Sequence, residues 1–303
     1  MTKTILILGG NGRFGRNASE AFRRAGWTIR QFDRSRDDLM QAAAGADIIL
    51  NGWNPPYTDW ASEVPALTAQ VIAAAKASGA TVILPGNVYV FGRDAPARFD
   101  DATPHRATNG LGRIRIGMED AYRRSGVRTI LVRAGDYIDT CASGNWFDMI
   151  LTKKLAKGIF TYPGNPDVPH GWAYLPDLLR AIVDLAEMRD QLAPFEDIAF
   201  PGYTMSGNQL CAALAEATGR PVRLKRMNWW PIRAAGLVWP MGRRLAEMSY
   251  LWSKPHHLGG AKFDRLLPDF RPTPASVALA SAIGDNVNPD QPVVRADIAV
   301  TAH

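Results

Sequence analysis

Cysteine is scarce in this chain, which has two in 303 residues. Cys141 and Cys211 lie far apart and show no metal-ligand spacing, so we expect neither a disulfide framework nor a metal site. This usage fits a reducing compartment. The stretch Met1 to Leu8 is too short for a secretory signal and runs straight into a glycine turn. We therefore expect a cytoplasmic protein.

Long apolar runs are also missing, because no uninterrupted run reaches the length that spans a membrane. The formal net charge is +6, which suits an anionic ligand such as a dinucleotide or a nucleotide sugar. The basic residues are scattered in small clusters and form no stripe interleaved with aromatic residues, which argues against nucleic acid. We expect a small-molecule substrate, no nucleic acid and no membrane contact, and we leave a homodimer open.

The most informative feature of the chain is a glycine turn between an expected strand, Thr4 to Leu8, and an expected helix, Arg16 to Ala25. Gly9 would make the tight turn, Gly12 would let the backbone approach a pyrophosphate, and Gly15 would let the helix pack closely on the strand. The free N–H groups and positive dipole end of the helix would then hold the phosphates. This order of elements predicts a dinucleotide site.

The second expected strand, Trp27 to Phe32, ends at two residues that favour different cofactors. Asp33 lies about 20 residues past the glycine turn, where a carboxylate binds the ribose 2′-OH of NAD. Arg34, together with Arg13 of the glycine loop, would instead pair with the 2′-phosphate of NADP. We expect NAD(P), with the two arginines favouring NADP. A solvated charge run over residues 33–38, without a ligand, is the alternative.

Strands and helices alternate along the first two thirds of the chain. Further strands are expected at 46–50, 80–84, 128–132 and 198–201, and helices at 39–44, 65–78, 113–124 and 177–187. This alternation predicts an α/β fold with a parallel sheet and right-handed crossovers. The short span between the second and third strands indicates that one strand–helix unit of other such domains is absent.

The remaining part of the chain is less regular. Residues 146–157 are expected to form a helix, and residues 206–218 another, with Ser206 as its N-cap and Gly219 at its end. The Trp-rich segment from Met227 to Trp252 favours an amphipathic helical cover over the core. A bulky apolar substrate pocket and a contact with a membrane surface are the alternatives for this segment.

At the level of motif order, residues 3–284 resemble the extended and atypical short-chain dehydrogenase/reductases, the NAD-dependent epimerase/dehydratases. The resemblance is carried by Gly9-x-x-Gly12-x-x-Gly15, Asn87 to Gly92, the helix around Glu119, Arg133, and Tyr174 to Ala181 with Asp177. It implies a Rossmann-type doubly wound parallel sheet with a smaller, mainly helical substrate region. The expected activity is that of an NAD(P)-dependent oxidoreductase or epimerase/dehydratase on a nucleotide sugar or small ketone. The expected division is a Rossmann domain over 1–165, to which 176–203 returns, a substrate-binding cover over 204–284, and a surface tail over 285–303.

The family's catalytic Ser/Thr, Tyr and Lys are all replaced in this chain. The resemblance places the Ser/Thr position at Asn87, the Tyr position at Leu111 and the Lys position at Arg115. Asn87 can still bond a substrate oxygen, and Arg115 can bind a ribose hydroxyl or stabilise negative charge. Leucine carries no proton, so the usual acid is absent. A protein that binds NAD(P) without turnover, as a sensor or assembly subunit, is the alternative function.

A replacement acid is expected close to Asn87. Tyr89 follows two residues later and shares the face of Asn87 if the backbone is extended. Asp136 and Tyr137, at the end of the next strand, are further candidates. For each of these residues the alternative is a purely structural role, as a packed tyrosine or an ion-paired aspartate. His170 and Trp172 could line the substrate cleft, although a lone histidine is more often a loop residue. The predicted catalytic residues are Asn87, Tyr89, Arg115 and Tyr137. The predicted cofactor-binding residues are Gly9, Gly12, Arg13, Phe14, Gly15, Asp33, Arg34, Asn54 and Arg115.

Overall fold

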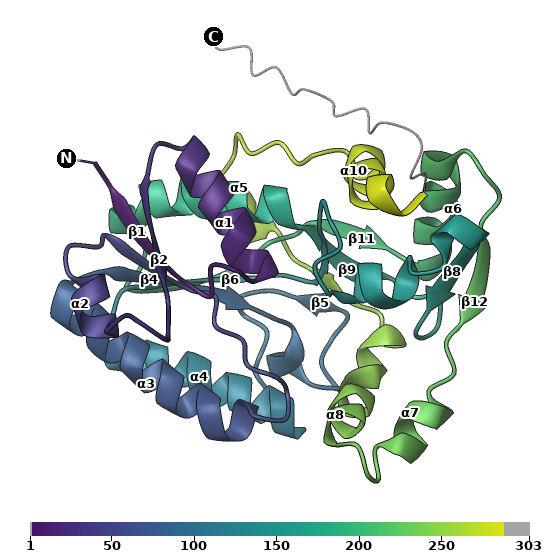
Figure 1. The fold of residues 1–303 in the computed structure, drawn as a ribbon, viewed down its shortest axis with the longest axis horizontal. Helices are drawn as coiled ribbons and strands as arrows, with labels where there is room; N and C mark the ends of the chain where they lie inside the picture. Colours follow the sequence, from purple (N-terminus) through teal and green to yellow (C-terminus); the bar gives the residue numbers. More distant parts are fainter. Residues whose placement is uncertain (1, 288–303) are drawn as a thin grey trace.

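The computed structural model describes residues 2–287 of the chain (Figure 1). Its centre is a six-stranded parallel sheet with the order β10-β6-β4-β3-β1-β2. The strands are β1 (Thr4–Leu8), β2 (Thr28–Phe32), β3 (Ile48–Asn51), β4 (Thr81–Gly86), β6 (Thr129–Arg133) and β10 (Phe195–Ala199). The strand order reverses at β1, since β2 lies on one side of it and β3 on the other, and ligands bind at such points in open α/β sheets.

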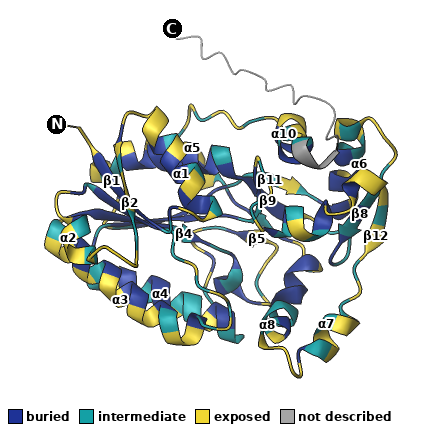
Figure 2. Cartoon of the chain, in the orientation of Figure 1, coloured by how far each residue is buried: buried dark blue, intermediate teal, exposed yellow. Residues whose placement is uncertain are grey.

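Helices cover both faces of this sheet, with the buried residues on their inner sides (Figures 1 and 2). One face is covered by α1 (Arg13–Arg24) and α5 (Leu175–Glu187), and the other by α2 (Leu39–Ala43), α3 (Trp60–Ser78) and α4 (Gly110–Ser125). The inner strands β1, β3 and β6 are buried along their whole length, as strands covered on both faces must be. The predicted Rossmann-type doubly wound fold is confirmed, including the absent strand–helix unit.

A smaller region lies beside the carboxyl ends of the strands and has its own apolar core. Its sheets are β11-β9-β7, from Asp136–Ile138 (β7), His170–Tyr174 (β9) and Tyr203–Met205 (β11), and β12-β8, from Ile159–Tyr162 (β8) and Arg223–Arg226 (β12). A further pair joins β5 (Arg98–Phe99) to β13 (His257–Leu258). Its helices are α6 (Gly207–Thr218), α7 (Trp230–Ala235), α8 (Pro240–Met248), α9 (Ala261–Leu266) and α10 (Ala275–Val287).

Several sequence-based boundaries are confirmed and others are wrong. Ser206 caps α6 through a capping box, and Gly219 ends it at φ +63°, as expected. The first helix begins at Arg13, earlier than expected, because Gly12 already serves as its N-cap. The expected helix over 146–157 is instead a π-helical turn, η2 (Phe147–Leu151), and a 3-10 turn, η3 (Leu155–Lys157). The backbone N–H and the hydroxyl of Thr152 both bond the Phe147 carbonyl, which widens and ends the first turn.

The Trp-rich segment is not one helix. It forms α7, then α8, then a 3-10 turn η5 (Ser249–Trp252), because Pro231 and Pro240 each start a new helix. Shorter 3-10 turns are η1 (Tyr89–Phe91) and η4 (Arg189–Gln191). None of the helices in the described part of the chain is long and apolar enough to cross a bilayer. Beyond Val287, the predicted surface tail lies outside the described residues, and the domain division remains a prediction.

Candidate active site

A cavity of about 1030 Å³ lies at the carboxyl edge of the central sheet. It extends from the glycine loop after β1, past the ends of β3, β4 and β6, to α8 and Trp252. A volume of this size is at the upper end of the range of ligand pockets, so it has room for a dinucleotide and a second molecule together. Of the predicted site residues, only Gly15 and Asp33 do not line this cavity.

The glycine loop has the close approaches that its spacing predicts. Gly9 has φ +77°, and a Cβ there would lie 2.9 Å from the Gly52 carbonyl oxygen. At Gly15 a Cβ would lie 2.3 Å from the Gly9 carbonyl oxygen, which allows no side chain. The first turn of α1 contains no acidic residue, and Gly12 caps it without a side chain. The N-terminus of α1 is therefore open to an anion.

The end of β2 separates the two residues that favour different cofactors. Asp33 accepts hydrogen bonds from Ser35 and from Arg36 Nε at 2.8 Å, and these bonds lower its pKa to about 2. Its carboxylate is thereby engaged within its own loop. Arg34 instead lies 5.4 Å from the centre of the Trp53 ring and lines the cavity, with Glu63 as a distant ionic partner at 3.9 Å. Arg34 is the better placed of the two to meet a ligand.

Arg13 and Arg16 tie the start of α1 to the loop after β7. Arg13 Nε donates to the Ser143 carbonyl at 3.1 Å, and its terminal nitrogen donates to the Gly144 carbonyl. Arg16 forms an ion pair of 2.6 Å with Asp139, whose side chain is buried. Arg13 thus closes the cavity beside the glycine loop, which leaves Arg34 as the candidate for a 2′-phosphate contact. Asn54 is exposed at the rim of the same cavity.

Asn87 and Tyr89 both line the cavity, although the backbone between them is not extended. Tyr89 begins the 3-10 turn η1, and its N–H donates to Asn87 Oδ1 at 3.0 Å. This bond leaves the Asn87 Nδ2 group to donate to a ligand. The Tyr89 hydroxyl shares a hydrogen bond of 2.7 Å with the hydroxyl of Tyr57. Burial raises the pKa of both phenols, so each is protonated at neutral pH.

Arg115 extends from α4 towards these phenols. Its guanidinium lies 4.6 Å from the centre of the Trp60 ring, and burial lowers its pKa. Its charge acts against the raised pKa of Tyr57, Tyr89 and Tyr137. The Arg115 Nε–H is buried without a hydrogen-bond partner. A buried unpaired donor in a cavity wall is available to a ligand oxygen or to water.

Leu111 does not line the cavity. Its side chain is fully buried in the core between the sheet and α4, and its N–H donates to Glu247 Oε1 at 2.7 Å. Glu247, which also accepts from Asn109 at 2.9 Å, thereby holds the start of α4 against α8. The position expected for the family's tyrosine therefore has a structural role here.

Tyr137 and Asp136 line the cavity at the end of β6. Burial raises the pKa of Tyr137 to about 12, and its ring lies beside that of Phe14. Asp136 bonds His170 Nε2 at 2.7 Å. His170 and Trp172 are on β9 and are buried, so neither lines the cavity, and His170 reaches it through Asp136. The expectation that both line the cleft is therefore wrong, since the strand places them one layer behind it.

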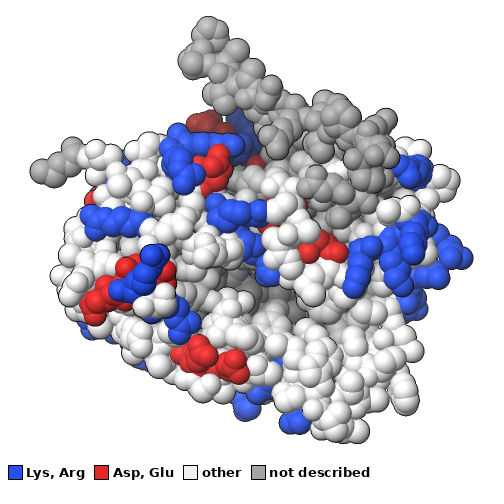
Figure 3. All heavy atoms as spheres, in the orientation of Figure 1, with Lys and Arg blue, Asp and Glu red and all other residues white. Residues whose placement is uncertain are grey.

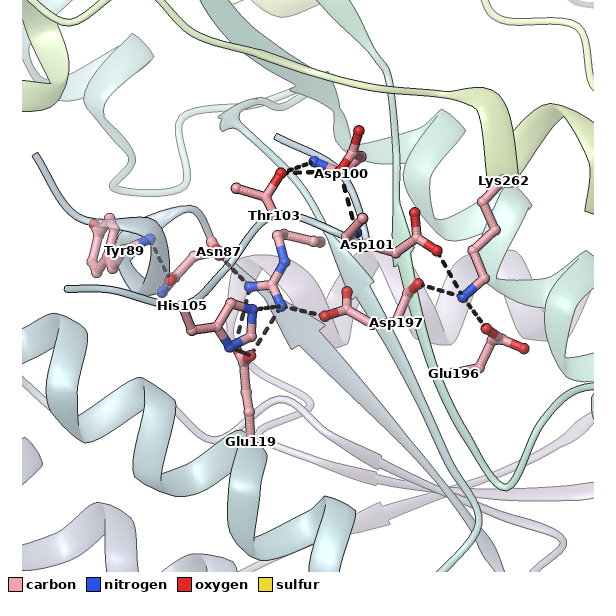
Figure 4. A network of polar contacts seen from close by, with 12 residues as sticks. Asn87, Tyr89, Asp100, Asp101, Thr103, His105, Glu119, Glu196, Asp197 and Lys262 are labelled. Carbon is pink, nitrogen blue, oxygen red and sulfur yellow. Dashed lines mark hydrogen bonds and ion pairs between the residues drawn. The ribbon is translucent and has the colours of Figure 1, made fainter. Parts of the chain in front are cut away.

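A buried ionic network fixes the floor of the site (Figure 4). The Arg133 guanidinium bonds the Asn87 carbonyl at 2.6 Å, Glu119 at 2.9 Å and Asp197 at 2.7 Å. His105 lies at its edge, 3.5 Å from Arg133, and burial lowers the pKa of this histidine. Although His105, Glu119 and Asp197 are close enough to hold a metal ion, the Arg133 guanidinium already bonds both carboxylates. The network instead holds Asn87 in place.

The far half of the cavity is apolar. Of the described residues beyond Ile138 that line it, none is charged. The largest are Trp146, Met149, Ile150, Met241, Leu245, Met248, Leu251 and Trp252. On α8, Met241, Leu245 and Met248 follow the i, i+4, i+7 spacing that gives one helix face. This helix therefore forms the cavity wall opposite the glycine loop.

Three of these features were missed by the sequence reasoning. Tyr57 lies in the segment after β3, and its bond to Tyr89 joins residues far apart in the sequence. Nothing in the sequence around Trp60 indicates that its ring packs against the Arg115 guanidinium. The α8 stripe falls within a segment in which an apolar pocket was one of the alternatives, and its proline at position 240 marks where the helix starts.

Known proteins resemble this chain in structure. No protein-family model and no curated protein matches its sequence. A nucleoside-diphosphate-sugar epimerase from Pseudomonas aeruginosa is 16% identical, with 94% of this chain and 97% of that chain covered at a TM-score of 0.71. The Bordetella bronchiseptica enzyme WbmH, solved with NAD+, is 15% identical, with 94% and 98% covered at a TM-score of 0.67. A variant UDP-glucuronic acid 4-epimerase from Bacillus cereus, solved with NAD and UDP-4-deoxy-4-fluoro-glucuronic acid, is 14% identical, with 93% and 98% covered at a TM-score of 0.69.

The predicted resemblance is confirmed at the level of the fold. These neighbours, which include nucleotide-sugar epimerases, share their fold with this chain over nearly its full length. The loss of the Tyr-x-x-x-Lys pair, with Leu111 and Arg115 at those positions, stays a prediction of the sequence.

Proposed function

We propose that this protein is an NAD(P)-dependent oxidoreductase that interconverts a carbonyl and a hydroxyl group on an apolar small molecule. One observation carries the proposal: a single cavity joins an arginine-lined glycine loop to an apolar chamber, with Asn87, Tyr89 and Arg115 between them. The close approaches at Gly9 and Gly15 hold the tight turn that a pyrophosphate-binding loop needs, and the unpaired Arg115 Nε–H suits a ribose or substrate oxygen. The residues present therefore fit a nicotinamide dinucleotide.

NADP is the preferred form in this proposal. Asp33 already accepts hydrogen bonds from Ser35 and Arg36 and does not line the cavity, which places it less well for a ribose 2′-OH. Arg34 lies over Trp53 at the cavity wall, and a guanidinium binds phosphate with two parallel bonds. Arg13, which bonds the loop at Ser143 and Gly144, would lie nearer the pyrophosphate.

The chemistry divides between the cofactor and the chain. A bound nicotinamide supplies or accepts the hydride. In the reductive direction, Asn87 Nδ2 orients the carbonyl oxygen and the Tyr89 hydroxyl gives it a proton. Tyr57, at 2.7 Å, then returns a proton to Tyr89 and takes one in turn from solvent, which its half-buried side chain can reach. The Arg115 charge stabilises the phenolate that forms in between.

The substrate in this proposal is a carbonyl compound with an apolar body. A nucleotide sugar carries a diphosphate, and a buried diphosphate needs cationic or N–H partners. The chamber beyond Ile138 offers none among its described lining side chains apart from Asn145 and Ser143, which carry no charge. An apolar ketone or alcohol would instead bury its surface against α8 and Trp252.

A cofactor-binding protein without turnover is the second candidate. The observation in its favour is Leu111, which is buried, bonded to Glu247 and unable to carry a proton. The two candidates agree on the cofactor and differ on whether Tyr57 and Tyr89 replace the missing acid.

Titration of NADPH and NADH tests the proposal. We expect tighter binding of NADPH, and a loss of about tenfold for NADPH alone in Arg34→Ala. Arg24→Ala, an exposed arginine on α1 that does not line the cavity, is the control and should leave NADPH binding unchanged. An equal loss for both cofactors in Arg34→Ala would remove the 2′-phosphate role. Tight binding without oxidation of NADPH by any of a panel of apolar ketones would favour the sensor.

A further inference from the structure

The hairpin of α7 and α8 projects a large apolar tip from the molecule. Trp230 is 73% exposed, Leu237 83% and Val238 89%, and Trp239 is also exposed. The turn between the helices is closed by the Trp239 N–H, which bonds the Ala235 carbonyl at 2.7 Å, and by the Val238 N–H, at 3.0 Å from the same oxygen. The exposure therefore belongs to a built turn. Apolar patches of this kind mark interaction sites.

The chain around this tip is cationic throughout. Residues 217–246 contain no Asp or Glu and seven basic residues, Arg220, Arg223, Lys225, Arg226, Arg233, Arg243 and Arg244. Arg233 on α7 and Arg243 on α8 are exposed beside the tip, and β12 adds the exposed Arg223, Lys225 and Arg226. In Figure 3 the basic side chains gather over β12, on the same side of the molecule as the hairpin. The partner must therefore be negatively charged.

Three kinds of partner differ in how well they fit these features. A second copy of the same surface would set cations against cations, which disfavours self-association. A nucleic acid would use the tryptophans for stacking but would leave Leu237 and Val238 exposed to water. A bilayer with anionic headgroups fits both the apolar tip and the cations around it. The tryptophans suit the membrane interface, Leu237 and Val238 reach the acyl region, and the arginines bind the headgroups.

We propose that the α7–α8 tip docks the protein on an anionic lipid bilayer. Residues 230–239 enter the headgroup region as a shallow anchor, and the cations of α7, α8 and β12 supply the attraction. The anchor lies outside the cavity, which α8 lines with its other face through Met241, Leu245 and Met248. Docking therefore does not depend on the proposed reaction.

Vesicle flotation with the full chain tests this proposal. We expect binding to vesicles of equimolar phosphatidylcholine and phosphatidylglycerol, little binding to phosphatidylcholine alone, and release at high salt. Trp230→Ser with Leu237→Ser should weaken binding about tenfold for each side chain. The matched control is Met40→Ser with Val277→Ser, two exposed apolar residues on α2 and α10, which should leave binding unchanged.

Charge reversal gives a second arm. Arg233→Glu with Arg243→Glu should weaken binding by at least about 25-fold, at about fivefold for each cation removed. The control variant Arg113→Glu with Arg265→Glu, whose arginines are exposed on α4 and α9, should lose far less vesicle binding. The proposal is overturned if the protein binds no vesicles or binds neutral vesicles equally well. It is also overturned if the variant with Trp230→Ser and Leu237→Ser binds anionic vesicles as strongly as the wild type. Sedimentation equilibrium that shows a dimer broken by the tip variant, without vesicle binding, would assign the tip to a second copy.

Discussion

The two halves of the cavity differ in the charge of the residues that line them. The half next to the glycine loop is lined by Arg13, Arg16, Arg34 and Arg115, whereas the half formed by residues beyond Ile138 has no charged lining residue within the described chain. The first half also lies against the buried ionic network of Arg133, while the second is backed by stacked aromatic rings such as His170 on Trp252. This difference in lining is what the proposed pair of ligands requires, a polyanionic cofactor in one half and an apolar molecule in the other.

The largest effect is expected at the glycine loop. In Gly15→Val the new Cβ would overlap the Gly9 carbonyl, so the turn must move. We expect NADPH binding to be lost and the free energy of unfolding to fall by about 3 kcal/mol. Calorimetric titration and urea unfolding measure both. The control is Gly117→Val on α4, where a Cβ would meet no other atom, and this variant should bind NADPH normally. An equal loss of NADPH binding in Gly117→Val would show that the effect is not specific to the glycine loop.

The junction of the two halves is tested by Tyr89→Phe. Without the hydroxyl bonded to Tyr57, kcat for ketone reduction should fall about 100-fold or more, while NADPH affinity stays unchanged. Tyr250→Phe is the control, because the Tyr250 hydroxyl is buried without a partner. Unchanged turnover in Tyr89→Phe would remove this residue as the acid and direct attention to Tyr137 and Asp136.

The apolar half is tested by placing a charge in it. Leu245→Arg should raise KM for an apolar ketone by about 30-fold, since the guanidinium must stay near the substrate body or fill the chamber. NADPH affinity should not change, because Leu245 lies on the opposite wall. Leu245→Met is the conservative control. A lower KM for a nucleotide sugar than for any ketone in the wild type would reverse the assignment of this half.

The smallest effect at neutral pH concerns His256, which is buried in the smaller region against Phe99 and His170. Burial, then the neighbouring His170, lowers its pKa from 6.5 to about 3. The unfolded chain gains this proton first as the pH falls, so stability is full above pH 6.5 and is lost down to about pH 3. His256→Gln should flatten this loss, which is about 1.4 kcal/mol per pH unit at most. Urea unfolding against pH measures it, with His257→Gln as the control; equal slopes in wild type and His256→Gln would contradict it.

The same division explains what the sequence could predict. The cofactor half follows from local rules, because Gly9, Gly12 and Gly15 act within one turn and the strands that flank them are continuous apolar runs. The pairing of Tyr57 with Tyr89, and the position of His170 behind Asp136, depend on how separate elements pack. Sequence spacing does not contain that information.

The helices of the smaller region show the same limit. Residues 146–157 have helical periodicity, yet Thr152 bonds back to Phe147 and breaks the segment into turns. The tip at Leu237 and Val238 has the composition of a covered surface, and only the fold shows that it is exposed. Short elements are decided by their tertiary contacts more than by their propensities.

The central claim is that one cavity brings a nicotinamide cofactor and an apolar carbonyl compound together. Transfer of deuterium from NADPH labelled at nicotinamide C4 tests it directly, with product analysis by mass spectrometry over apolar ketones and UDP-sugars. We predict deuterium on the carbinol carbon of an apolar alcohol, and none on a sugar. Deuterium that stays on the cofactor with every ketone, while NADPH remains tightly bound, would contradict the claim.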